Sequence, residues 1–184
     1  TGGIHLDGFC DTADALYSRR EQAEKLRILK DPHCGPFAVF SVILVLLLSF
    51  GAYTELYRTQ GIQTAGLLTG GFVLIRCLSG ISVTTFPIVP ASSLVKTFGE
   101  NAARGERWIL LGESLAVSAV LLLFWHWLAL CLLLLTLLIF GGCARMEQKQ
   151  FGGVTGDLAG FFLVLGETGW LLGAALLGGV FSCV

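Results

Sequence analysis

The longest apolar run of this chain sets the strongest limit on what it can fold into. Residues 109–142 span 34 positions, and Glu113 is the one charged residue among them. A single helix of that length would measure about 51 Å, which exceeds a hydrocarbon core of about 30 Å even when the helix is tilted. A Trp-His-Trp sequence centred on His126 interrupts the run near its middle, and interfacial aromatic residues beside a polar one favour a turn at a membrane surface. The sequence therefore predicts two membrane-spanning segments here, at about 109–125 and 127–143.

Three further apolar segments complete the predicted membrane domain, at about 36–53, 64–83 and 158–182. Hydrophobic residues make up 54% of the 184 residues and charged residues only 14%, against about 25% in soluble domains. We therefore predict an all-α, polytopic helical membrane protein with about five transmembrane helices in contact with the lipid bilayer. The chain 1–184 is expected to form a single integral-membrane domain, with the bundle at about 36–182. A net charge of −1 argues against nucleic acid as a partner.

Five spans would place residues 1–35, 84–108 and 144–157 on one side of the membrane. Ten of the twelve basic residues fall on that side, namely Arg19, Arg20, Lys25, Arg27, Lys30, Lys96, Arg104, Arg107, Arg145 and Lys149. Because positively charged loops remain in the cytoplasm, this side is predicted to be cytoplasmic. The acidic candidates described below fall on the same side, which predicts one active face.

Three aspartates near the amino terminus form the first candidate site. Asp7, Asp11 and Asp14 follow the spacing i, i+4, i+7, which puts them on one face of a helix. Such like charges need a counter-charge, and carboxylate oxygens suit Mg²⁺, Mn²⁺ or Ca²⁺. Gly8 permits close backbone approach, and His5 could contact phosphate, act as an acid or base, or be structural. The alternative is that the three acids are simply solvated residues of a loop.

The polar region 1–35 is also predicted to contain a short amphipathic helix. Ser18 and Glu21 fit the S-x-x-E capping box, in which the two side chains satisfy the first backbone N–H groups of a helix. This pattern predicts a helix from Arg19 to about Lys30.

The connection before the last span holds the second candidate site, Phe-Gly-Gly-Val-Thr-Gly-Asp at 151–157. Gly152 and Gly153 could expose backbone N–H groups that cradle a phosphate, and Thr155 belongs to the same phosphate-binding motif. Asp157 stands at the start of a predicted helix. The alternative is that Asp157 only caps that helix.

Three charged residues fall within predicted spans, and one of them, Glu113, lies near the start of its span, where it is expected to snorkel. Arg76 is costly to place in a membrane and such residues tend to be functional, so a phosphate-binding role is one reading and snorkelling to the interface is the other. Glu167 lies in the middle of the last span, where a carboxylate should have a partner or be protonated.

These motifs, in this order, resemble the cobalamin synthase family, the adenosylcobinamide-GDP ribazoletransferases. The resemblance covers almost the whole chain, and its first and last motifs are specific in combination. The matching residues are Gly2-Gly3-Ile4-His5-Leu6-Asp7-Gly8, Asp11-Thr12-Ala13-Asp14, Lys30-Asp31, Arg76 and Gly152-Gly153-Val154-Thr155-Gly156-Asp157. Members of the family begin upstream of the first motif, so we expect a missing amino-terminal helix or helices before Thr1.

The resemblance implies a reaction in which α-ribazole, or its 5′-phosphate, displaces GMP from adenosylcobinamide-GDP, the last assembly step of adenosylcobalamin. It implies Mg²⁺ as the cofactor and the bacterial plasma (inner) membrane as the location, with a cytoplasmic catalytic face. The expected metal ligands are Asp7, Asp11, Asp14 and Asp157. The expected catalytic residues are Asp11, Asp157 and His5, and the expected phosphate contacts are Arg76, Gly152, Gly153 and Thr155.

Other functions remain open at the level of sequence. A CDP-alcohol phosphotransferase would have Ala-Arg after its Asp-Gly, whereas Asp7-Gly8 is followed by Phe9-Cys10. A polyprenyl-phosphate sugar transferase also uses aspartates at the membrane edge, but lacks the Gly-Gly-x-Thr-Gly-Asp motif. A cation-coupled transporter subunit should place its polar residues near the bilayer midplane, where Arg76 and Glu167 are the candidates.

Overall fold

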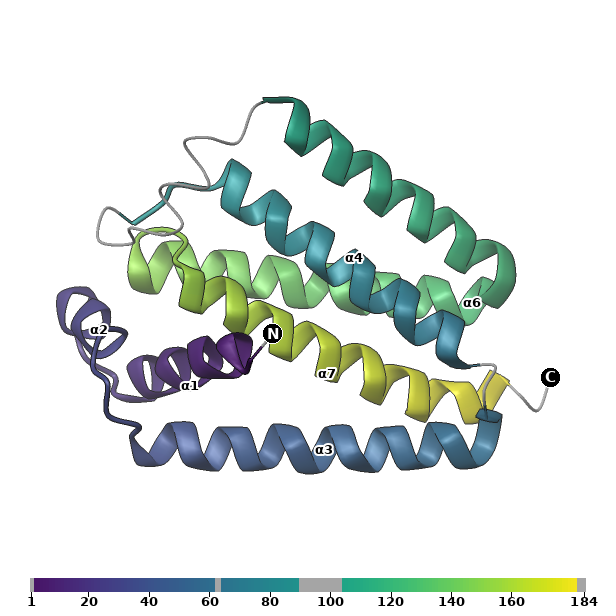
Figure 1. Cartoon of the computed structure of the whole chain (residues 1–184), viewed down its shortest axis with the longest axis horizontal. Coiled ribbons are helices and arrows are strands. Elements are labelled where there is room, and N and C mark those ends of the chain that lie inside the picture. Colours follow the sequence, from purple (N-terminus) through teal and green to yellow (C-terminus); the bar gives the residue numbers. More distant parts are fainter. Residues whose placement is uncertain (1, 62–63, 90–103, 182–184) are drawn as a thin grey trace.

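The computed structural model describes residues 2–61, 64–89 and 104–181, and these fold into helices (Figure 1). The helices are α1 (Ile4–Tyr17), α2 (Gln22–Ile28), α3 (Pro36–Gln60), α4 (Thr64–Thr85), α6 (Arg104–Phe151) and α7 (Gly156–Phe181). Four of them contain a stretch long and apolar enough to cross a membrane, at Pro36–Gln60, Thr64–Thr85, Gly105–Phe151 and Gly156–Gly178. The predicted all-α membrane fold is confirmed.

Helix α6 is broken at the predicted turn. His126 has φ 41° and ψ −114°, which no α-helix contains. Figure 1 shows the chain reversing there, so that the two arms, 104–125 and 127–151, run in opposite directions. The two arms together with α3, α4 and α7 give the five spans predicted from sequence.

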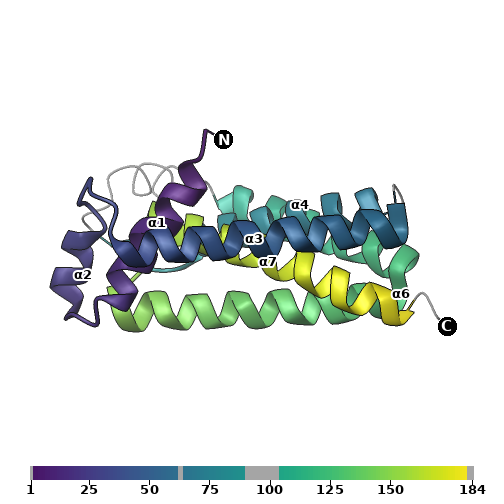
Figure 2. The ribbon, with the colours of Figure 1, turned by 90° about the horizontal axis from the view of Figure 1, so that it is seen from below.

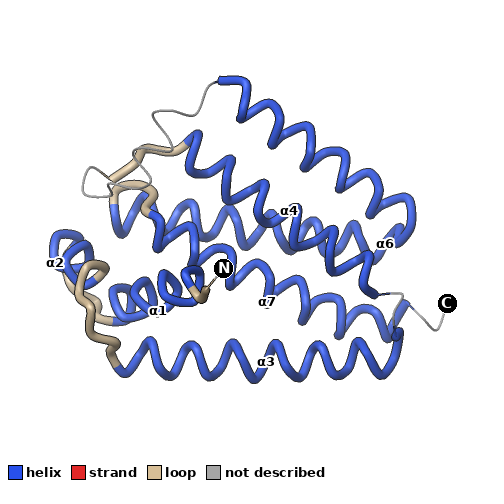
Figure 3. Tube along the Cα trace, in the orientation of Figure 1, coloured by secondary structure: helices blue, strands red, loops and turns tan. Residues whose placement is uncertain are grey.

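The connections group at two ends of the bundle as predicted. Figure 3 shows the loops around α2, the loop after α4 and the loop before α7 gathered at one end, while the break at His126 lies at the other. Backbone pairing ties two of these loops together, because Ile88 and Val154 form an isolated parallel bridge. Residues 90–103 of the predicted 84–108 connection lie outside the described residues.

Helix α7 forms the centre of the bundle. In the most apolar 18-residue stretch of each helix, 56% of α7 is buried but only 17% of α3. Helix α3 is therefore the helix that offers most of its surface to lipid. Trp170 of α7 is fully buried, and its indole Nε1 donates a hydrogen bond to the carbonyl oxygen of Leu67 at 3.2 Å. The ring occupies the space left by Gly71, where a Cβ would lie 2.2 Å from it.

Helix α1 does not run along the bundle. Figure 2 shows it rising at a steep angle to α3 while α2 lies beyond the end of the spans. Its contacts are mainly with α7 and α3, so the amino-terminal motif is held between two membrane helices.

The predicted capping box is wrong. Ser18 follows the last residue of α1, and its hydroxyl donates a hydrogen bond to the carbonyl oxygen of Ala15 at 2.7 Å. The next helix begins at Gln22 and ends at Ile28, shorter than the predicted 19–30. The sequence pattern failed because the end of α1 uses the serine that the box would need.

Candidate functional site

The three aspartates lie on α1, as their spacing predicts. The helix spans Ile4–Tyr17, so Asp7, Asp11 and Asp14 are on successive turns of one face. Asp7 is exposed, whereas Asp11 and Asp14 are half-buried. The alternative that these residues belong to an irregular loop is therefore wrong.

A close helix crossing brings a fourth carboxylate to this face. A Cβ at Gly8 would lie 2.7 Å from the Cα of Asp157 and 2.9 Å from its carbonyl oxygen. On the other helix, a Cβ at Gly160 would lie 3.2 Å from the carbonyl oxygen of His5. The backbones of α1 and α7 thus touch where both helices have a glycine, and Asp157 lies beside the acidic face of α1.

The carboxylates act on one another electrostatically. Burial, followed by the negative charges of Asp7, Asp157 and Asp14 in that order, raises the pKa of Asp11 to about 6. Burial also raises the pKa of the neighbouring Cys10 thiol to about 11, so this thiol is neutral near pH 7. We name Asp7, Asp11, Asp14 and Asp157 the acidic cluster.

The acidic cluster has the chemistry of a hard-cation site, although its side chains are not yet arranged around one. Within residues 2–61, 64–89 and 104–181, no three His, Cys, Asp or Glu side chains are grouped closely enough to hold a metal ion. The donors of the cluster are carboxylate oxygens, the type that Mg²⁺ prefers, and their mutual repulsion is unrelieved. The donor type of the cluster therefore suits Mg²⁺, and an Mg²⁺ site here stays a prediction.

Asp14 has a structural role that the sequence did not reveal. Its carboxylate accepts hydrogen bonds from the backbone N–H groups of Gly35 at 2.6 Å and Ala38 at 2.9 Å. These groups belong to the first turn of α3, whose own cap residue is a glycine without a side-chain acceptor. A Cβ at Gly35 would lie 2.7 Å from both carboxylate oxygens. Asp14 thus caps α3 from another helix.

The glycine loop 152–153 does not offer free N–H groups. The N–H of Gly152 donates to the carbonyl oxygen of Gln148 at 3.2 Å, and that of Gly153 to Glu147 at 3.4 Å, which closes the end of α6. Gly152 has φ 79°, and a Cβ at Gly153 would lie 2.3 Å from the carbonyl oxygen of Pro87. The expectation that these amides cradle a phosphate is corrected, because they are bonded within the protein.

The start of α7 separates the roles of Thr155 and Asp157. The hydroxyl of Thr155 accepts a hydrogen bond from the N–H of Leu158 at 3.2 Å, which makes Thr155 the cap of α7. Asp157 lies in the first turn, where the helix dipole favours a negative charge. The alternative that Asp157 is only the cap is therefore wrong, and Thr155 has a structural contact in place of the predicted phosphate contact.

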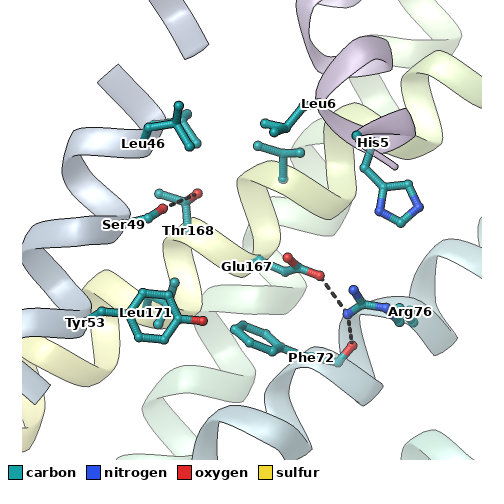
Figure 4. Close-up of a pocket in the computed structure, with 13 residues that line it drawn as sticks. His5, Leu6, Leu46, Ser49, Tyr53, Phe72, Arg76, Glu167, Thr168 and Leu171 are labelled. Atoms are coloured by element: carbon teal, nitrogen blue, oxygen red, sulfur yellow. Dashed lines mark hydrogen bonds and ion pairs between the residues drawn. The ribbon is translucent and has the colours of Figure 1, made fainter. Parts of the chain in front are cut away.

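Arg76 of α4 and Glu167 of α7 face each other, with Arg76 exposed and Glu167 half-buried (Figure 4). The guanidinium Nη1 lies 2.7 Å from Oε1 of Glu167 and donates to the carbonyl oxygen of Phe72 at 3.0 Å. The expected partner of Glu167 is thereby found. Both side chains line a cavity of about 250 Å³ to which His5 also contributes. None of the four aspartates lines that cavity, so the structure groups His5 and Arg76 apart from the acidic cluster.

Fold and site define a class of protein: a polytopic helical membrane protein with an acidic cluster at one end of its bundle. Residues 1–175 match the family model described as cobalamin-5-phosphate synthase. The chain is 38% identical over 165 residues to the adenosylcobinamide-GDP ribazoletransferase of Lachnoclostridium phytofermentans, a match covering 89% of this chain and 62% of the relative. It is 37% identical over 174 residues to that of Clostridium perfringens strain 13, covering 94% and 68%. No solved structure matches the chain.

The chain belongs to the cobalamin-5-phosphate synthase family. A further relative, the adenosylcobinamide-GDP ribazoletransferase of Pseudomonas fluorescens, is 36% identical over 177 residues, covering 96% of this chain and 70% of the relative. The chain spans 62% of the length of the Lachnoclostridium relative. The family resemblance seen in the sequence motifs is confirmed.

Proposed function

We propose that this protein is an adenosylcobinamide-GDP ribazoletransferase. A ribose hydroxyl of α-ribazole, or of its 5′-phosphate, attacks the phosphorus atom that carries the cobinamide. The pyrophosphate bond breaks, GMP leaves, and the hydroxyl proton passes to a base. The observation that carries the proposal is the meeting of Asp157 with the three aspartates of α1 across the Gly8 crossing, in a chain that matches this family over 1–175.

The acidic cluster is the proposed Mg²⁺ site. Asp7, Asp11 and Asp157 are not committed to helix capping, so they would hold the ion, and Asp14 would add an oxygen while it caps α3. When bound, the ion neutralises charge that develops on the phosphates.

The protein side chains supply positioning and proton transfer. Asp157 is proposed either as a metal ligand or as the base that accepts the ribazole hydroxyl proton. If Asp157 is a metal ligand, Asp11 is the proposed base. His5 and Arg76 remain predicted contacts of the substrate from the cavity side. The ion pair with Glu167 and the bond to Phe72 both use Nη1 of Arg76, so within the described part of the chain its other N–H groups are available to a ligand.

We also propose that the acidic end of the bundle faces the cytoplasm across the bacterial plasma membrane. Residues 1–35 and 144–157 lie at this end and carry seven of the twelve basic residues, as the positive-inside rule requires of a cytoplasmic face. A cysteine added in α2 tests this orientation. In right-side-out vesicles a membrane-impermeant thiol reagent should not label it.

Release of GMP from adenosylcobinamide-GDP tests the function. Membranes containing the full-length protein are assayed with α-ribazole and Mg²⁺, each omitted in turn. Release should require both, and Asp11→Asn should lower the rate by about 100-fold or more. The matched control is Glu24→Gln, which removes an exposed carboxylate of α2 paired only with Arg27 at the surface. Release that continues without α-ribazole, or full activity of Asp11→Asn, would contradict the proposal.

A transporter is the functional alternative from another class, and the ion pair of Arg76 and Glu167 is the observation that favours it. A cation-coupled carrier would show uptake that depends on Glu167 and no release of GMP. The position of the acidic cluster at one end of the bundle, with the pair neutralised internally, favours the transferase.

A further inference from the structure

The cavity of Figure 4 begins close to the acidic cluster. Gly3, His5 and Leu6 from the start of α1 form part of its wall. The N–H of Asp7 donates to the carbonyl oxygen of Gly3 at 2.9 Å, so one helical turn, about 5.4 Å, separates this wall from Asp7 along α1. The wall of the cavity at Gly3 therefore lies about one helical turn from the acidic cluster along α1.

The size of the cavity limits what it can hold. Its volume of about 250 Å³ is below the about 300–1,000 Å³ of pockets that hold whole drug-sized ligands. A corrin macrocycle or a complete guanosine diphosphate group exceeds this volume. One flat bicyclic ring with its attached sugar at the opening matches the space.

The walls of the cavity are apolar with a few fixed polar groups. The apolar side chains are Leu6, Val45, Leu46, Phe72, Val164 and Leu171. The hydroxyl oxygens of Ser49 and Thr168 lie 3.5 Å apart and point toward each other across the gap between α3 and α7 (Figure 4). Apolar walls with a small number of placed hydrogen-bonding groups are typical of sites for neutral aromatic ligands.

The charge of the cavity also favours an uncharged ligand. Glu167 compensates the charge of Arg76 at 2.7 Å, so a phosphate here would meet a carboxylate beside the guanidinium. The remaining titratable groups of the lining are His5 and Tyr53.

We propose that this cavity binds the base of α-ribazole, an uncharged dimethylated benzimidazole, and directs the attached ribose to the acidic cluster. The inference rests on the function proposed above and adds a binding site for one of the two substrates. It assigns the specificity for ribazole to α3 and α7, and leaves the corrinoid to another surface.

Filling the cavity tests the proposal. In the full-length protein in lipid nanodiscs, Ser49→Leu should raise the KM for α-ribazole by about tenfold, equivalent to about 1.4 kcal/mol of binding. The KM for adenosylcobinamide-GDP should remain unchanged. Leu46→Phe, which fills the cavity from a lipid-exposed position, gives the same test if Ser49→Leu fails to fold. The matched control is Ser41→Leu, on the same helix, similarly half-buried and outside the lining, which should alter neither KM.

Equilibrium dialysis with α-ribazole alone, and with 5,6-dimethylbenzimidazole as competitor, separates this inference from the proposed function. Wild-type protein should bind α-ribazole, the free base should displace it, and Ser49→Leu should bind less. If the wild type binds in this way but releases no GMP, the transferase assignment fails and the cavity assignment stands. Three results would overturn the inference. The first is an equal increase in both KM values, and the second is an unaltered KM for α-ribazole in both filling variants. The third is failure of the wild type to bind α-ribazole.

Discussion

At the scale of single residues, Asp14 differs from the other members of the acidic cluster because it also caps α3. Asp14→Ala removes the acceptor of two backbone N–H groups, those of Gly35 and Ala38. Losing such a cap costs about 0.5–2 kcal/mol, so we expect a lower midpoint of thermal unfolding in detergent. Asp7→Ala is the comparison, since Asp7 is exposed and its side chain caps no helix among the described residues. Equal midpoints for the two variants would show that the cap contributes nothing.

His126 is the second residue whose backbone makes a prediction. Its φ of 41° and ψ of −114° lie near the first central position of a type II′ turn, where glycine is preferred. A non-glycine residue in such a region carries strain of about 1–3 kcal/mol. His126→Gly should therefore raise the unfolding midpoint, as followed by the loss of helical circular dichroism. A lower midpoint would show that the imidazole stabilises the turn by more than its backbone strain costs.

At the scale of helices, the acidic cluster depends on the crossing of α1 over α7. Gly8→Ala would place a Cβ 2.7 Å from the Cα of Asp157, and overpacking of this kind costs about 1–3 kcal/mol. We expect α1 to shift, with loss of both stability and GMP release. Gly51→Ala is the matched control, because Gly51 lies in α3 with open space around its Cα and alanine there should stabilise the helix. Normal activity of Gly8→Ala would mean that the crossing does not position the cluster.

The ion pair between α4 and α7 is a second link between helices. Arg76→Leu leaves the carboxylate of Glu167 without its partner at 2.7 Å, whereas Arg76→Leu with Glu167→Leu removes both charges of the pair. An unpaired charge in the membrane lowers the free energy of unfolding more than removal of both charges does. The double variant should therefore unfold at a higher temperature than Arg76→Leu. Additive effects of the two substitutions would contradict a direct pairing.

At the scale of the whole molecule, part of the arrangement could be predicted from sequence and part could not. The turn at His126 was predictable because the length of the 109–142 run conflicts with the thickness of a membrane. The common face of the aspartates followed from helical periodicity. The contacts of Asp14 with Gly35 and Ala38 join residues more than twenty positions apart through backbone groups, and no side-chain pattern signals them. The amides of Gly152 and Gly153 donate to the carbonyl oxygens of Gln148 and Glu147 at the end of α6, and these backbone bonds likewise have no side-chain signal in the sequence.

The central claim is that carboxylates of α1 and α7 together form one Mg²⁺ site, and calorimetric titration of Mg²⁺ into the full-length protein in nanodiscs tests it most directly. Asp7→Asn and Asp157→Asn remove one carboxylate from each helix, and Glu24→Gln removes an exposed one outside the acidic cluster. We predict that both cluster variants bind Mg²⁺ more weakly by about tenfold or more, equivalent to about 1.4 kcal/mol, while Glu24→Gln binds as the wild type does. Wild-type affinity in Asp157→Asn would contradict the account, because the site would then belong to α1 alone.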